Sequence, residues 1–174
     1  MGIWGARVLL VDDDGDDLKV ASRALQDRGA DVIIVPNAGT ALATVIGVLP
    51  DVLVVDLSQA AAAGIGFVHR LRSLSPEKGG QIPALTLAPL PLEGLMLREW
   101  LEAGFQGHFL KPIPTLDLTA AVARWAGQSV ERRRRALNPR LWPSGVLRDR
   151  RAERRAELTP PYTPERLVLG TARG

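Results

Sequence analysis

Continuous apolar runs alternate along the chain with stretches in which apolar residues recur at helical spacing. The run at residues 52–55 lies between a Pro50-Asp51 turn and Asp56. Its length and its Val content are typical of a strand buried on both faces, as in a parallel sheet. Further strands are predicted at residues 7–11, 32–35, 82–88 and 107–110. The pattern therefore predicts an α/β domain whose parallel strands are joined by right-handed crossovers.

Helical spacing predicts helices at about residues 16–28, 39–48, 65–74, 92–103 and 115–125. In the first of them, Leu18, Ala21 and Leu25 form one apolar face. The apolar stripe of the second helix is predicted to consist of Leu42, Val45, Ile46 and Leu49. Residues 58–64 are expected to form the loop into the third helix, and residues 130–137 are compatible with an extension of the last one.

Charged residues follow three of the predicted strands. Asp12 and Asp13 follow the first strand, Asp56 follows the third, and Lys111 follows the fifth. Because the carboxyl ends of parallel strands meet at one edge of the sheet, these side chains should gather where open α/β sheets bind ligands. A carboxylate can accept a phosphoryl group, Mg²⁺ prefers oxygen ligands, and a lysine ammonium pairs with phosphoryl oxygens. The pattern predicts Asp56 as a phosphoacceptor, Asp12 and Asp13 as magnesium ligands, and Lys111 as the cation.

Three motifs carry a resemblance to a known family. Val11-Asp12-Asp13, the run at residues 50–57, and the segment that ends in Lys111-Pro112 together resemble the receiver domain of bacterial two-component response regulators. The resemblance covers about residues 5–126. It implies a flavodoxin-like, doubly wound, five-stranded parallel sheet in the order 2-1-3-4-5.

The same resemblance implies how the site works. Asp56 and the backbone carbonyl of Ser58 would complete the ligands of Mg²⁺, and the Lys111-Pro112 bond would be cis. Asp56 would take its phosphoryl group from a histidine kinase or phosphotransfer protein. The chain would then signal to a downstream protein by contact, through the helix at residues 92–103, the strand at residues 107–110 and the helix at residues 115–125. It would not act as an enzyme on a separate substrate.

The chain departs from the receiver pattern at three places. Ala88 stands at the end of the strand at residues 82–88, where receivers place a Ser or Thr, so the hydroxyl that would bond a phosphoryl oxygen is missing. Gln59-Ala60 replaces the usual Met-Pro after the acceptor, and His108 replaces the switch aromatic on the strand at residues 107–110. These changes leave the acceptor intact and weaken the expected conformational switch. The alternative to a phosphoacceptor is therefore an interaction or dimerisation module that works without phosphorylation. A homodimer is compatible with either function.

The charge is divided unevenly between a core at residues 1–126 and an extension at residues 127–174. The extension holds 12 of the 22 basic residues and 5 of the 19 acids. Rich in Arg and interrupted by Pro, it is predicted to be largely disordered or partly helical. Its arginines, among them Arg132–Arg135, suit weak nonspecific nucleic-acid binding, with an undefined tail or a protein-docking segment as the alternative.

The remaining composition excludes several classes of protein. The chain has no cysteine, and hence no disulfide framework, thiolate metal site or cysteine nucleophile. No apolar run reaches the roughly 20 residues that a membrane helix needs. We therefore expect no membrane insertion and a cytoplasmic location. A glycine-rich phosphate loop after the first strand is also missing, which argues against a dinucleotide-binding or P-loop fold.

Overall fold

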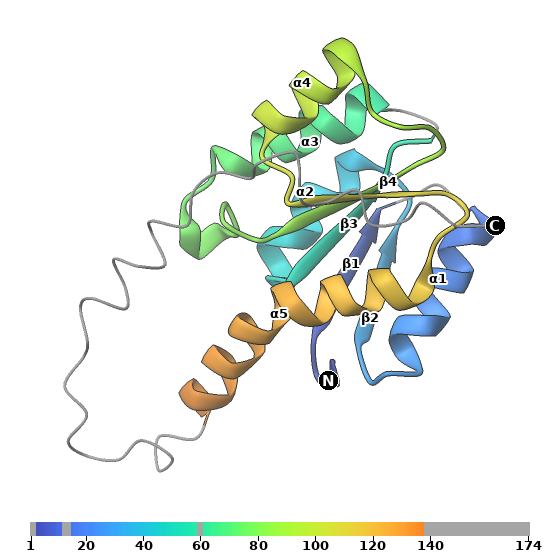
Figure 1. Ribbon diagram of the computed structural model, residues 1–174. Helices are drawn as coiled ribbons and strands as arrows, with labels where there is room; N and C mark the ends of the chain where they lie inside the picture. Colours follow the sequence, from blue (N-terminus) through green and yellow to red (C-terminus); the bar gives the residue numbers. More distant parts are fainter. Residues whose placement is uncertain (1–2, 12–14, 59–60, 138–174) are drawn as a thin grey trace, which may run out of the picture.

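The computed structural model describes residues 3–11, 15–58 and 61–137, and it contains a parallel sheet flanked by helices (Figure 1). The strands are β1 (Arg7–Val11), β2 (Asp31–Val35), β3 (Val52–Asp56), β4 (Ala84–Ala88) and β5 (Gly107–Leu110). The α-helices are α1 (Asp16–Gln26), α2 (Ala38–Val48), α3 (Ala61–Arg72), α4 (Gly94–Ala103) and α5 (Thr115–Leu137), and a 3₁₀ turn lies at Pro76–Lys78. Every predicted strand is present.

The strand order is β2-β1-β3-β4-β5, and all neighbouring strands are parallel. This is the flavodoxin-like order that the receiver resemblance implied. The two central pairings place Val11 beside Val55 and Asp56 beside Leu87. The strand β5 follows with Ala88 beside Leu110. Because this register aligns the carboxyl ends of β3, β4 and β5, the residues that follow them reach one edge of the sheet.

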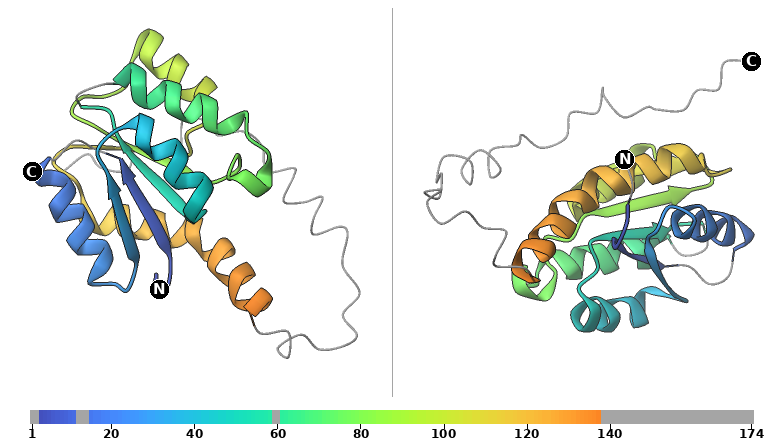
Figure 2. Two further views of the ribbon diagram at one scale, coloured as in Figure 1. Left: turned by 180° about the vertical axis from the view of Figure 1, so that it is seen from behind. Right: turned by 90° about the horizontal axis from the view of Figure 1, so that it is seen from below.

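Alternate residues of the strands enter two separate hydrophobic cores, one on each face of the sheet. Leu9, Leu53 and Val55 face the side covered by α2, α3 and α4. Val8 and Val54 face the side covered by α1 and α5. Figures 1 and 2 show α2, α3 and α4 over one face and α1 and α5 over the other. The central strands are buried on both faces, which explains their uninterrupted apolar runs.

The helix α2 is rotated relative to the apolar stripe that the sequence predicts. Ala41 and Val45 are its buried residues, whereas Ile46 and Leu49 are exposed. Leu42 is partly buried against the core. Leu49 caps the carboxyl end of α2 in a left-handed conformation, with φ of 50°. It therefore lies outside the helix and does not continue the apolar face. The predicted stripe was therefore wrong at two of its four positions.

The helix α3 begins at Ala61, within the stretch predicted to be a loop. Alanine has the highest intrinsic helix propensity, which favours an early start in the alanine run. Gly64 lies in its first turns at a point where Leu57 comes close. A Cβ atom added at Gly64 would lie 2.5 Å from Leu57 Cδ2. Glycine therefore lets the helix pack tightly on the end of β3, beside the site.

The helix α5 continues past Trp125 and ends at Leu137. Ala126 is buried and Val130 packs against the same core, so the apolar stripe extends beyond the predicted end. The chain is then free of proline until Pro139. Figures 1 and 2 show the last turns of α5 extending past the sheet. The helical extension over residues 130–137 is thus confirmed, while a domain boundary at residue 126 stays a prediction.

The arginine-rich extension falls mostly outside the described residues. Residues 138–174 lie there, and so do the side chains of Arg132–Arg135, although the backbone of these four belongs to α5. The predicted disorder and nucleic-acid binding of the extension therefore stay predictions. Within the described part of the chain, no helix combines the length and the apolar content needed to cross a membrane.

Candidate phosphoacceptor site

Asp56, the predicted phosphoacceptor, is the last residue of β3. Its side chain is only 3% exposed. The backbone amide of Ser58 donates a hydrogen bond to Asp56 Oδ1 at 2.7 Å, and the Ser58 hydroxyl donates to the same oxygen at 2.5 Å. Together these donors orient the carboxylate. The receiver resemblance implied a role for the backbone carbonyl of Ser58, and a role for its hydroxyl was not predicted.

Lys111, the predicted cation, reaches the same carboxylate from the end of β5. Its backbone amide donates to the Ala88 carbonyl at 2.9 Å, which extends the β4–β5 pairing by one residue. Its ammonium group donates to Asp56 Oδ2 and is itself 15% exposed. The Lys111–Pro112 peptide bond is cis, as the receiver resemblance implied. The structure therefore brings together the predicted acceptor and the predicted cation.

Asp17 is a third charged residue at this site, and the sequence did not predict its position. It lies in the first turn of α1, where an acid is ordinarily explained as a favourable partner of the helix dipole. Its carboxylate Oδ2 lies 3.7 Å from Lys111 Nζ, and its side chain is 46% exposed. The signal was its place soon after β1, a strand that ends at the same edge of the sheet as β3. Residues that begin the helix after such a strand stay close to that edge.

The predicted magnesium ligands are only partly described. Asp12 and Asp13 lie outside the described residues. Asp56 supplies a carboxylate, an oxygen donor of the kind that Mg²⁺ prefers. Among the described residues alone, no group of three acids or histidines converges on a point that could hold a metal. The donor chemistry at Asp56 thus fits a magnesium ion, and the contribution of Asp12 and Asp13 stays a prediction.

The end of β4 offers no hydroxyl to this site. Ala88 is the last residue of the strand and is buried. The nearest threonine on the same strand, Thr86, is also buried, and its hydroxyl donates to the Val55 carbonyl at 2.9 Å. This hydroxyl is therefore committed to the backbone of the neighbouring strand. It does not substitute for the Ser or Thr that receivers carry at the position of Ala88.

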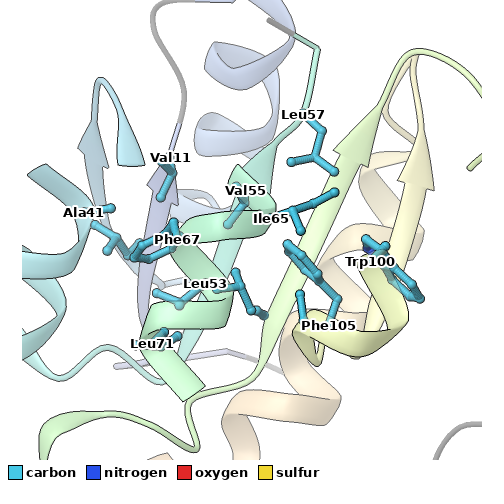
Figure 3. Close-up of a cluster of buried hydrophobic side chains, with 14 of the residues drawn as sticks. Val11, Ala41, Leu53, Val55, Leu57, Ile65, Phe67, Leu71, Trp100 and Phe105 are labelled. Atoms are coloured by element: carbon cyan, nitrogen blue, oxygen red, sulfur yellow. The ribbon is translucent and has the colours of Figure 1, made fainter. Parts of the chain in front are cut away.

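His108, at the expected place of the switch aromatic, packs against the aromatic residues of α4 and its following loop. Its ring lies 5.8 Å from the Trp100 ring in an edge-to-face arrangement. Trp100 in turn stacks on Phe105 with 5.7 Å between ring centroids. Figure 3 shows Trp100 and Phe105 side by side in the core beneath α4. His108 is half-buried, and desolvation lowers the pKa of its imidazole below the ordinary value.

This pKa shift predicts a loss of stability in acid. Above the ordinary value of 6.5, His108 is neutral in both the folded and the unfolded chain. As the pH falls through 6.5, the unfolded chain takes up a proton that the folded chain resists, so the free energy of unfolding decreases. The decrease ends only below the folded-state pKa. We expect chemical unfolding between about pH 7 and pH 5 to show a steeper decrease for the wild type than for His108→Phe.

His69 provides the matched control, because it is the other histidine of the chain and its side chain is exposed on α3. The His69→Phe variant should keep the wild-type slope. Equal slopes for wild type and His108→Phe would contradict the assignment of the acid sensitivity to His108.

Comparison with known proteins identifies several relatives, and among them PrrA and GacS carry receiver domains. An uncharacterised 14.6 kDa protein of Leptolyngbya boryana is 33% identical over 118 residues, which cover 68% of this chain and 88% of that protein. The transcriptional regulatory protein PrrA of Mycobacterium bovis is 29% identical over 121 residues, or 70% of this chain and 50% of PrrA. The chain therefore matches only half the length of that regulator. No family model matches the chain.

Solved structures give the same class of protein. The chemotaxis response regulator CheY4 of Vibrio cholerae is 27% identical with a TM-score of 0.60, and the match covers 69% of this chain and 98% of CheY4. The receiver domain of the sensor histidine kinase PA1611 of Pseudomonas aeruginosa is 24% identical with a TM-score of 0.62, covering 71% of this chain and 98% of that domain. The chain belongs to the family of response regulator receiver domains. Such domains are signalling modules of two-component systems.

Proposed function

We propose that Asp56 accepts a phosphoryl group from a phosphohistidine of a histidine kinase or a phosphotransfer protein. The observation that supports this most directly is the pairing of a buried carboxylate with the ammonium of Lys111. The carboxylate is the nucleophile, and the lysine is a cation within reach of the group that the carboxylate would receive. Phosphoryl transfer depends mainly on positioning and on charge stabilisation, and this pair supplies both.

In the transfer step, a carboxylate oxygen of Asp56 forms a bond to phosphorus while the bond from phosphorus to the donor nitrogen breaks. The electron pair of that bond stays on the imidazole of the donor, which becomes protonated by solvent. Asp56 loses its own charge as the phosphoryl group arrives. Lys111 then exchanges its partner, from the carboxylate to an oxygen of the phosphoryl group. The Ser58 donors keep the carboxylate in place until the new bond forms.

Asp56, the backbone carbonyl of Ser58, and Asp12 and Asp13 would hold a magnesium ion. Bound there, Mg²⁺ would neutralise part of the charge on the phosphoryl oxygens. Two considerations support this assignment. The donors are all oxygens, and the receiver domain of PA1611 is described with a magnesium ion in its active-site cleft.

The proposal is tested by exposing the full chain to a small acyl phosphate with and without Mg²⁺ and following the intact mass. We expect one phosphate-sized mass gain that requires Mg²⁺. Reduction with borohydride, which converts an aspartyl phosphate to homoserine, followed by peptide mapping should locate the modification at Asp56. No mass gain, from a donor that modifies another receiver in the same buffer, would contradict the proposed function.

A second candidate is an interaction module that works without phosphorylation. The observation that favours it is the lack of a hydroxyl at Ala88, combined with the commitment of the Thr86 hydroxyl to Val55. If this candidate is correct, hydrogen exchange in β4 and α4 should be the same before and after treatment with the acyl phosphate. A change in exchange there would support a phosphorylation-dependent signal to a downstream protein.

A further inference from the structure

Asp17 places a third charge next to the proposed acceptor. Lys111 lies in contact with the carboxylate of Asp56, and its Nζ lies 3.7 Å from Oδ2 of Asp17. The two carboxylates differ sharply in environment, because Asp56 is 3% exposed and Asp17 is 46% exposed. Asp17 therefore stands on the solvent side of the site, where an incoming donor arrives.

The position of Asp17 opposes what phosphoryl transfer needs. Lys111 must leave the carboxylate of Asp56 and follow the phosphoryl oxygens, and Asp17 attracts the same ammonium. The negative charge of Asp17 also repels an anionic phosphoryl donor. Both effects weaken the positive field that Lys111 would otherwise offer to the transferred group.

We propose that Asp17 restrains phosphorylation of Asp56 by small anionic donors and so favours a protein donor, an inference that rests on the proposed function. A small acyl phosphate has little surface with which to offset the repulsion. A kinase or phosphotransfer protein gains binding energy from contacts remote from the phosphoryl group, and that energy can offset an unfavourable charge at the site. Asp17 is thus a specificity-determining residue, and it takes no part in bond formation.

The test compares the initial rate of mass gain with a small acyl phosphate for wild type and Asp17→Asn at saturating Mg²⁺. Because Asp17 is half-exposed, its effect is that of a solvent-screened charge, and we expect the variant to react about two- to fivefold faster at low salt. At about 1 M salt, where the Debye length is about 3 Å, the ratio should approach one.

Asp16→Asn is the matched control. Asp16 precedes Asp17 on α1, is 98% exposed, and pairs with Lys19 at 3.1 Å. This variant removes the same charge from the same helix turn, yet it should react at the wild-type rate. An equal acceleration in both variants would assign the effect to the net charge of the helix and would overturn the role of Asp17.

Three further outcomes separate the inference from the proposed function. Equal rates for wild type and Asp17→Asn, with both chains phosphorylated, would overturn the inference alone. A loss of Mg²⁺ affinity by more than about tenfold in Asp17→Asn would identify Asp17 as part of the cation site instead. That outcome would also overturn the inference. If neither chain gains phosphate, the proposed function fails and the inference fails with it.

Discussion

The Asp56→Asn variant is expected to gain no phosphate under conditions in which the wild type is fully modified. Asparagine has nearly the shape of aspartate, and its amide oxygen can still accept the hydrogen bonds that Ser58 donates to Oδ1. It lacks the negative charge and the nucleophilic oxygen pair, so it forms no acyl phosphate. The measurement is the intact mass after incubation with a small acyl phosphate and Mg²⁺, with circular dichroism to show that the variant is folded.

Asp27→Asn is the control for this substitution. Asp27 is exposed at the end of α1, where it pairs with Arg23 at 2.9 Å, far in sequence from the acceptor. This variant should be modified like the wild type. A mass gain that persists in Asp56→Asn and maps to another residue would show that the acceptor had been assigned to the wrong carboxylate.

The Arg72→Met variant is expected to lose about 2–4 kcal/mol of the free energy of unfolding, measured by chemical denaturation. Arg72 is the last residue of α3, and its guanidinium donates hydrogen bonds to three backbone carbonyls. It reaches Gly104 at 2.8 Å, Gly80 at 3.0 Å and Ile82 at 2.8 Å. Methionine fills a similar volume but donates nothing, so partly buried carbonyls would lose their partners. Burial lowers the pKa of Arg72, yet a guanidinium stays charged throughout the pH range in which proteins are folded.

The same arginine also donates to Gln106 Oε1, which accepts a hydrogen bond from the Ala84 amide at 2.7 Å. Arg72 thus connects the end of α3 to the start of β4 and to the loop after α4. Arg70→Met is the matched control, because Arg70 is exposed on the same helix, and it should change the stability by no more than about 0.5 kcal/mol. Equal losses in both variants would show that the helix, rather than these hydrogen bonds, responds to the loss of charge.

The candidate site was predictable as far as it depends on the ends of strands. Asp56 and Lys111 each follow a buried apolar run, and a parallel sheet brings such positions to one edge. The contact between Asp17 and Lys111 was not predictable in this way. An acid in the first turn of a helix already has a local explanation as a partner of the helix dipole. Only the folded sheet, which brings the start of α1 within reach of the Lys111 side chain, gives this acid a second role.

The sequence by itself determined where the strands and helices lie along the chain and which charged residues follow the strands. These follow from local periodicity, because each strand or helix must bury its own apolar face. It also determined the absence of a hydroxyl at Ala88, which is a matter of residue type. The receiver resemblance then supplied the strand order that the structure confirms.

Only the tertiary structure decided how these elements meet. The rotation of α2, which buries Ala41 and exposes Ile46, depends on the surface of the sheet beneath it. The bond from the Thr86 hydroxyl to Val55 depends on the register of β3 and β4. The position of Asp17 beside Lys111 depends on where α1 starts relative to β5. All three features depend on how elements distant in the chain pack against one another. Local periodicity carries no information about that packing.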